Sequence, residues 1–401
     1  MDVPDGTITS PQGFLAGATA ARMRDDYAPG RLDLGLLVSE RRCAAAGVYT
    51  KNTMRGPPII TTERHLADGH AQAVIANSGV SNSLIGEQGM LTAREMAELA
   101  AAKLGVAVDD VVVASTGVTG WRLPVERIRD ALPAIELSPS GGGDFAHAIM
   151  TTDTVAKQAA ARFEWQGRAY TVGGAAKGSG MIHPNMATML AFLTIDAPVS
   201  AAALAPLVGE AADATFNMVT IDGDNSPNDM VVLLANGAAG GDEIGAGHPA
   251  LPALAAAVTH VSAAVARKLA RDGEGATKLI EVRVAGAANV DDARRAAKAV
   301  AGSLLVKSAI YGNDPNWGRV LVALGYSGVD AREERVALAI QGVELYRAGT
   351  PAAFDAAALS RSLAQERVEI RVDLGMGQSS ATAWGCDLTE EYVRINAEYT
   401  T

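Results

Sequence analysis

Short apolar runs and Ala-rich amphipathic stretches alternate along the whole chain. The apolar runs predict strands, because β-branched residues bounded by turn formers favour extended backbone; they lie at residues 111–115, 231–235, 280–284 and 368–374. Two stretches predict helices: residues 92–104, where Thr92 and Glu95 have capping-box spacing, and residues 291–304, which begin with two acids. Gly- or Pro-containing stretches predict connections at residues 138–144, 238–249 and 347–351. This interleaving predicts a mixed α/β (α+β) fold of packed layers and leaves the topology open.

Composition narrows the class of protein. The chain has 401 residues, enough for two or three domain-sized units, and its 48% hydrophobic and 20% charged residues are typical of a globular protein. Aromatic residues make up only 4%, so Ala, Val, Leu and Ile must build the core. The formal net charge is -11. An acidic surface repels phosphate backbones, which argues against nucleic-acid binding.

Nothing in the sequence demands a membrane or an oxidising compartment. No apolar run approaches the roughly 18 residues that span a bilayer. Residues 1–15 lack the basic flank and apolar stretch of a signal peptide. Cys43 and Cys386 are too few for a disulfide framework. We therefore expect a cytoplasmic protein without a membrane partner.

Several familiar catalytic and binding motifs are absent. The six histidines form no HExxH pair, and two cysteines cannot make a Cys-rich zinc site, so we expect no metal. Residues 222–228 resemble a calcium loop, but Pro227 stands where that loop needs Gly and Leu233 where it needs Glu, so we interpret them as a turn or packing motif. The Gly-rich residues 177–180 do not follow phosphate-loop order, and residues 377–381 miss the serine nucleophile elbow by one position.

One segment retains a chemical interpretation. In KGSGMIHPNMATMLAFL, residues 177–193, flexible small residues lead into Ala187–Thr188, and an apolar run follows. Cutting the bond between Ala187 and Thr188 would free the threonine's own α-amine. With a pKa of about 7.7–8.0, that amine can accept the hydroxyl proton near neutral pH and make Thr188 a nucleophile. A threonine that merely opens a strand is the competing interpretation.

Several blocks of the sequence match one family. KGSGMIHPNMATML resembles the self-cleavage segment of the glutamate N-acetyltransferase / ornithine acetyltransferase (ArgJ) family of arginine biosynthesis. Further similar blocks run in order from end to end, and the chain finishes with INAEYTT as that family usually does; they lie at residues 77–82, 115–118, 150–154, 220–224, 271–278, 312–319 and 381–389. On these motifs the chain is identified as a member of the family.

The resemblance implies that the precursor cuts itself between Ala187 and Thr188. An α chain of residues 1–187 would carry the oxyanion hole and part of the substrate site. A β chain of residues 188–401 would begin with the nucleophile, and its C-terminal tail would complete the pocket. The two chains would stay associated, commonly as an α2β2 heterotetramer. The fold implied is an α/β arrangement similar to that of self-processing aminopeptidases.

The resemblance also implies a ping-pong acetyl transfer. Thr188 would take the acetyl group from N2-acetyl-L-ornithine and pass it to L-glutamate, giving L-ornithine and N-acetyl-L-glutamate. Thr116 and Gly117 would form the oxyanion hole. The substrate contacts carried over from the family are Thr151 or Thr152, Lys177, Thr188, Glu274, Asn396 and Thr401. Lys177 suits a substrate carboxylate and Glu274 suits the ornithine ammonium, whereas His183, five residues before Thr188, has no catalytic role in the family.

The implied enzyme needs no cofactor, and its partners are small-molecule substrates. Some family members also use acetyl-CoA as a co-substrate, and no short motif here decides that point. Two other interpretations stay open: a self-processing aminopeptidase or amidase that passes the acyl group to water, and a binding protein that never cleaves.

Overall fold

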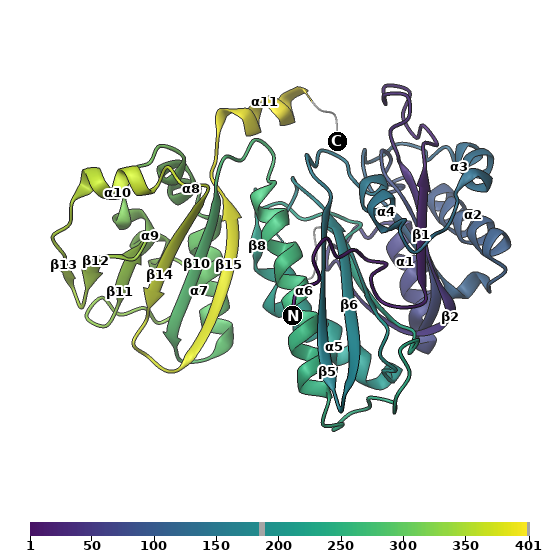
Figure 1. Ribbon diagram of the computed structural model, residues 1–401. Helices are drawn as coiled ribbons and strands as arrows, with labels where there is room; N and C mark the ends of the chain where they lie inside the picture. The colour runs from purple at the N-terminus through teal and green to yellow at the C-terminus, as the bar shows by residue number, and fades with distance from the viewer. Residues whose placement is uncertain (184–188, 399–401) are drawn as a thin grey trace.

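A computed structural model describes residues 1–183 and 189–398. Two sheets organise these residues (Figure 1). The first sheet has the order β4-β3-β2-β9-β7-β6-β5, with β1 also paired to β2. Its strands are β1 (Phe14–Thr19), β2 (Leu34–Tyr49), β3 (His70–Asn77), β4 (Val111–Ser115), β5 (Lys157–Trp165), β6 (Arg168–Lys177), β7 (Leu190–Ile195) and β9 (Met230–Ala235).

The long strand β2 divides this sheet into two halves. Its first part pairs with β1 and β3, its second part pairs with β9, and the register shifts between Val38 and Cys43. One hydrophobic cluster combines side chains from both halves, among them Val112 of β4 and Phe192 of β7. The halves therefore face each other across a shared core.

Helices cover the two outer faces. Alternate residues of β4, Val111 and Val113, pack in a cluster with α2 (Glu87–Leu104) and α3 (Val125–Ala131). Alternate residues of β7 pack in a second hydrophobic cluster with α5 (Ala201–Ala214) and α6 (Leu251–Arg271). The result is a helix–sheet–sheet–helix arrangement. Shorter helices complete this unit: α1 (Pro57–His65), α4 (Gly142–Ala148) and the 3-10 turns Leu66–Asp68, Val108–Asp110, Leu132–Ala134 and Phe216–Met218.

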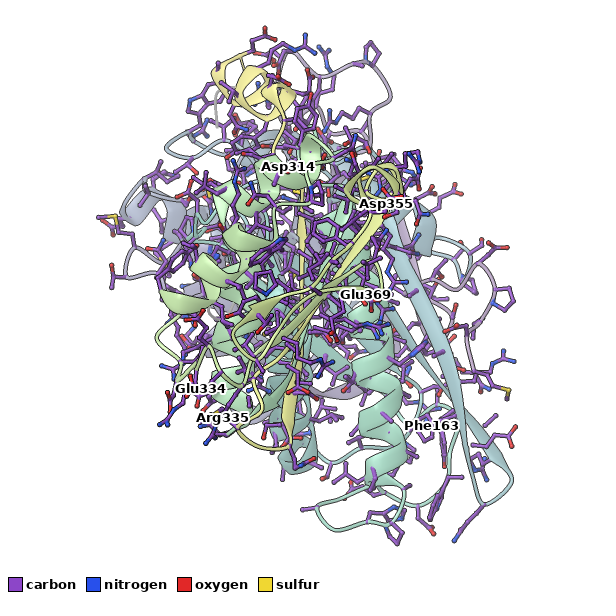
Figure 2. All side chains as sticks on the ribbon, turned by 90° about the vertical axis from the view of Figure 1, so that its left-hand side faces the viewer. Phe163, Asp314, Glu334, Arg335, Asp355 and Glu369 are labelled. Atoms are coloured by element: carbon purple, nitrogen blue, oxygen red, sulfur yellow. The ribbon has the colours of Figure 1, made fainter. Side chains whose placement is uncertain are left out.

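The second sheet has the order β13-β12-β11-β14-β10-β15-β8. Its strands are β8 (Val219–Thr220), β10 (Leu279–Ala287), β11 (Ala337–Ile340), β12 (Val343–Arg347), β13 (Thr350–Pro351), β14 (Arg367–Asp373) and β15 (Ser379–Cys386). The accompanying helices are α7 (Val290–Gly302), α8 (Leu304–Tyr311), α9 (Trp317–Gly325) and α10 (Ala356–Ser362). Figure 2 looks onto this unit, with Glu369 of β14 near its middle; this carboxylate pairs with Arg283 and Arg371.

The two units share one continuous core. A single cluster runs from β7 and β9 through α5 and α6 to α7 and the second sheet. Helix α11 (Glu390–Glu398) has no buried residue and lies across the top of both units (Figure 1). None of the helices in residues 1–183 and 189–398 is long and apolar enough to cross a membrane.

The strands predicted from the sequence are confirmed as β4, β9, β10 and β14. The helix predicted over residues 291–304 is α7, but it ends at Gly302, because Ser303 caps the start of α8. The helix predicted over residues 92–104 exists but begins earlier, at Glu87. The capping role of Thr92 was wrong, because its hydroxyl donates to the Gln88 carbonyl inside the helix.

The predicted connections are only partly confirmed. Residues 238–249 contain no helix or strand beyond one isolated bridge at Ile244. The connection predicted over residues 138–144 extends too far, because α4 already begins at Gly142. Residues 347–351 include the paired ends of β12 and β13 and so form a tight hairpin.

Candidate active site

One pocket lies where the two halves of the first sheet end, beneath α11. The ends of β4 and β6 and the starts of β7 and β9 all reach it. The residues that line it come from both sides of the sequence position 187–188: Ser81, Thr116, Gly117, Thr119, Thr151, Thr152, Lys177, Gly180, Met181, Met189, Leu190, Asp222, Asp224, Ser226, Asn228, Asp229, Glu274, Tyr392 and Asn396.

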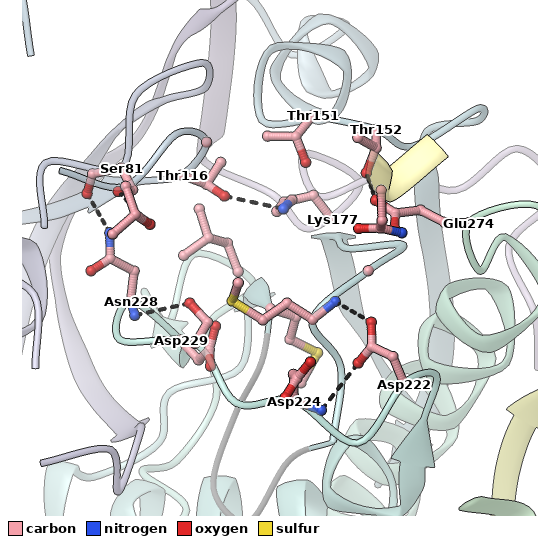
Figure 3. Close-up of a pocket in the computed structure, with 18 of the residues that line it drawn as sticks. Ser81, Thr116, Thr151, Thr152, Lys177, Asp222, Asp224, Asn228, Asp229 and Glu274 are labelled. Atoms are coloured by element: carbon pink, nitrogen blue, oxygen red, sulfur yellow. Dashed lines mark hydrogen bonds between the residues drawn. The ribbon is translucent and has the colours of Figure 1, made fainter. Parts of the chain in front are cut away.

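Most residues expected at the site meet in this pocket (Figure 3). They come from segments up to 280 positions apart in the sequence: Thr116, Gly117, Thr151, Thr152, Lys177, Glu274 and Asn396. Ala187, Thr188 and Thr401 lie outside the described residues. Met189, which directly follows Thr188 in the chain, lines the pocket.

The Thr116–Gly117 turn presents donors to the pocket. The N–H groups of Thr116 and Val118 donate to the carbonyls of Asn77 and Gly79, each at 3.0 Å. The Gly117 N–H between them has no hydrogen-bond partner among residues 1–183 and 189–398. Gly117 has φ +124°, and a Cβ there would lie 2.3 Å from the Gly79 carbonyl carbon. Only glycine fits this close approach of two backbones.

Lys177 ends β6 and lies opposite Leu190, the first residue of β7. Its Nζ donates to Oγ1 of Thr116 at 3.1 Å. Because that oxygen accepts from the lysine, the Thr116 hydroxyl proton is left to donate into the pocket. Burial lowers the pKa of the Lys177 ammonium, and the charge of Asp153 opposes this shift.

A buried ion network lies behind Lys177. Lys157 pairs with Asp153 and, at 2.6 Å, with Asp272, and the Lys157 side chain is fully buried. Asp153 also accepts from the N–H groups of Gly178 at 2.7 Å and Thr151 at 3.0 Å. Burial raises the pKa of Asp153, but the neighbouring Lys157 and Lys177 charges outweigh it and hold the pKa at about 2. The carboxylate therefore stays ionised and ties the Thr151 loop to the end of β6.

Glu274 supplies a buried carboxylate at one end of the pocket. It accepts from Oγ1 of Thr152 at 2.7 Å and from Nδ2 of Asn396 at 2.8 Å (Figure 3). Gly180 leaves the space for it, because a Cβ at that position would lie 2.3 Å from Oε2 of Glu274. Thr151 and Thr152 both line the pocket, but the Thr152 hydroxyl is already bonded to Glu274.

His183 does not line the pocket. Its Nδ1 lies 2.8 Å from Oγ1 of Thr220. Burial, with a smaller effect from Lys298, lowers the pKa of its imidazole to about 4.

Sequence reasoning missed an acidic wall of the pocket. Asp222, Asp224, Ser226, Asn228 and Asp229 all line the pocket. The first four belong to residues 222–228, which were interpreted as a turn or packing motif, and residues 220–224 were recognised only as a block that resembles the family. Among the described residues no group of three His, Cys, Asp or Glu is arranged to hold a metal ion.

Comparisons with known proteins agree with this picture. The model of the ArgJ family matches residues 15–401. A protein of Symbiobacterium thermophilum, "Arginine biosynthesis bifunctional protein ArgJ", is 53% identical over 398 residues, which cover 99% of both chains. A protein of the same name from Dehalococcoides mccartyi is 45% identical over 399 residues, covering 100% of this chain and 98% of the relative.

A solved structure is also similar. The crystal structure of arginine biosynthesis bifunctional protein ArgJ from Bacillus halodurans matches with a TM-score of 0.52 and 44% sequence identity. The match covers 53% of this chain and 100% of the solved chain. With a family model over nearly its whole length and relatives near half identity, this chain belongs to the ArgJ family.

Proposed function

We propose that this chain is a self-cleaving acetyltransferase of arginine biosynthesis. It moves an acetyl group from N2-acetyl-L-ornithine to L-glutamate, with Thr188 as the nucleophile, and gives L-ornithine and N-acetyl-L-glutamate. One observation carries the proposal: free donors at Thr116–Gly117, the ammonium of Lys177 and the carboxylate of Glu274 share one pocket with Met189, the neighbour of Thr188.

Self-cleavage comes first. The Thr188 Oγ adds to the Ala187 carbonyl carbon, the peptide C–N bond breaks, and the released nitrogen takes up the hydroxyl proton. An ester now joins Ala187 to Oγ of Thr188. Water hydrolyses it, which leaves a carboxylate on Ala187 and a hydroxyl and free α-amine on Thr188.

The acetyl transfer repeats this chemistry. The Thr188 amine takes the hydroxyl proton while Oγ attacks the acetyl carbon of acetylornithine; the acetyl–nitrogen bond breaks, and ornithine leaves with that proton. The glutamate amine then attacks the acetyl ester and restores the hydroxyl. Thr116 and Gly117 donate to the oxygen that becomes negative in each step, where one such donor contributes about 3–4 kcal/mol.

The charges of the pocket suit these amino acids. The Lys177 ammonium pairs with a substrate carboxylate, and its positive charge favours the neutral form of the Thr188 amine. Glu274 receives the ornithine ammonium, with Thr152 and Asn396 already bonded to its two oxygens. Thr151 and Thr401 complete the substrate contacts in this proposal.

The length of the solved relative supports the division into two chains. The Bacillus halodurans chain is matched over its full length by 53% of this chain. Residues 188–401 are 214 of the 401 residues, which is the same share. We infer an α chain of residues 1–187 and a β chain of residues 188–401, assembled as an α2β2 heterotetramer in the cytoplasm, with acetyl-CoA as a possible further acetyl donor.

The intact mass of the denatured wild-type protein tests the proposal first. We expect two chains whose masses match residues 1–187 and 188–401, and a single full-length chain with Thr188→Ala. The purified protein should move acetyl from acetylornithine to glutamate, and parallel assays with acetyl-CoA test the second donor. Cleavage or transfer that survives in Thr188→Ala would exclude Thr188 as the nucleophile, and release of acetate without glutamate would indicate an amidase instead.

A further inference from the structure

The carboxylate of Asp222 holds a turn that the proposed mechanism does not use. Its Oδ2 accepts from the N–H of Met181 at 2.6 Å (Figure 3). Its Oδ1 accepts from the N–H of Ile182 at 2.8 Å. Oδ1 also accepts from the N–H of Asp224 at 3.2 Å. Three backbone donors, two of them 40 and 41 positions earlier in the chain, therefore converge on one side chain.

The turn at residues 180–182 needs this support. It lies outside every helix and strand. Met181 adopts φ +55°, a left-handed conformation that costs a residue with a Cβ roughly 1–2 kcal/mol. Next to Asp222, the N–H of Ile221 donates to the Ile182 carbonyl at 2.6 Å. The N–H and the carbonyl of Ile182 are thus both hydrogen-bonded.

The held turn leads to the proposed cleavage site. Ile182 is five residues before Ala187 in the chain. The Asn225 Nδ2 donates to the His183 carbonyl at 3.2 Å, so the fixed backbone continues to residue 183. On its other side the turn begins at Gly180, which packs against Glu274. Displacing the turn would move both the approach to the bond and one wall of the pocket.

Asp222 also reaches the C-terminal helix. Burial raises the pKa of the Tyr392 phenol on α11, and the negative charge of Asp222 adds to this effect. Tyr392 and Asp222 line the same pocket. The Asp222 carboxylate therefore lies close both to the turn before the cleavage site and to the helix above the pocket.

We propose that Asp222 is a positioning residue for self-cleavage: by fixing the Met181–Ile182 backbone it sets the direction in which the chain enters the Ala187–Thr188 bond. The inference rests on the proposed function, because it assumes that this bond is cut. Asp222 touches the backbone of the turn and takes no part in the covalent steps.

The test is the rate at which the full-length chain separates into two after synthesis, followed by intact mass. Asp222→Asn leaves one acceptor oxygen for three N–H groups, and Asp222→Glu keeps the charge but moves it by one methylene. We expect both variants to cleave about tenfold or more slowly, since small misplacements of reacting groups carry costs of this size.

Asp196→Asn is the matched control. Asp196 is buried and also accepts from backbone N–H groups, those of Thr171 at 2.7 Å and Gln12 at 3.1 Å, at the far end of β6 and β7. We expect it to lose thermal stability and still cleave at the wild-type rate, which separates positioning from general destabilisation. If Asp222→Asn does not fold, Asp222→Glu decides.

The outcomes distinguish the two proposals. If the wild-type chain does not cleave, the proposed function fails. If the wild type cleaves and folded Asp222→Asn or Asp222→Glu cleaves equally fast, the positioning role is overturned. It is also overturned if Asp196→Asn slows cleavage as much as the Asp222 variants do.

Discussion

The Nζ of Lys177 donates a hydrogen bond of 3.1 Å to Oγ1 of Thr116 and so joins the end of β6 to the turn after β4. These residues are 61 positions apart in the sequence. The bond occupies one lone pair of the hydroxyl oxygen and leaves its proton for another acceptor. A neutral hydroxyl beside a buried ammonium is a suitable donor to an oxygen that becomes negative.

Removing this hydroxyl should slow both reactions of the proposed mechanism. For Thr116→Ala we expect self-cleavage and acetyl transfer to fall about 10²–10³-fold, because one oxyanion donor is lost. Intact mass over time measures the first rate, and ornithine release measures the second. Thr194→Ala is the control, since that hydroxyl is buried and donates to the Ile8 carbonyl away from the pocket. Unchanged rates in Thr116→Ala would exclude it as a donor.

The buried ion network supports a prediction about stability. Lys157→Met removes the ammonium that pairs with both Asp153 and Asp272, so these two carboxylates lose this positive charge. We expect the free energy of unfolding to fall by about 3–5 kcal/mol, as is usual when one partner of a buried ion pair is removed. Denaturant melts at pH 7 measure the change. Exposed Lys51→Met should stay within about 0.5 kcal/mol of wild type, and an equally small change in Lys157→Met would contradict the prediction.

His183 should make stability depend on pH. Its folded pKa of about 4 lies below the usual value of 6.5, since burial and Lys298 disfavour the charged ring, while Asp222 opposes them. Between these values the unfolded chain binds more protons, so stability falls as the pH is lowered from about 6.5 to about 4. The imidazole is only partly buried, so we expect a loss of about 1–2 kcal/mol rather than the roughly 3 kcal/mol of a fully transmitted shift.

The variant His183→Asn isolates this contribution. Denaturant melts at pH 7 and pH 4.5 should differ by about 1–2 kcal/mol less in His183→Asn than in wild type, because the other titrating groups are common to both chains. An equal pH dependence in the two proteins would assign the effect elsewhere.

Local patterns predicted much of the fold, but the site required tertiary contacts. Strand β4 was evident from its sequence. All five of its residues are buried, so both of its faces carry apolar or small residues and the run is continuous. The start of α2 was not, since Gly86 precedes it without a side-chain cap. Periodicity cannot show that β2 bends and brings two halves of one sheet face to face.

The same limit applies to the pocket. Its expected residues came from the family resemblance, because spacing alone does not join Thr116 to Glu274. The acidic wall was missed because Asp222 acts through backbone N–H groups 40 and 41 positions earlier. Nothing in the local sequence indicates such a partner.

The contact between Gly180 and Glu274 gives the sharpest test of the pocket. In Gly180→Ala the new methyl group would lie 2.3 Å from Oε2 of Glu274, so the carboxylate must move. The position has no positive φ, and alanine fits the backbone there. In the proposed mechanism Glu274 holds the ornithine ammonium, a charge-assisted contact of about 1.5–3 kcal/mol. We expect the KM for acetylornithine to rise about tenfold or more, with a smaller change in kcat.

Two further variants show whether this effect passes through the carboxylate. Glu274→Gln should raise the same KM, and Gly180→Ala combined with Glu274→Gln should add little, because both changes act on one contact. Gly143→Ala is the control, since a Cβ there meets no atom within 4 Å. Wild-type KM in Gly180→Ala would show that Glu274 can shift without loss, whereas fully additive effects would place the cause of the Gly180 defect outside Glu274.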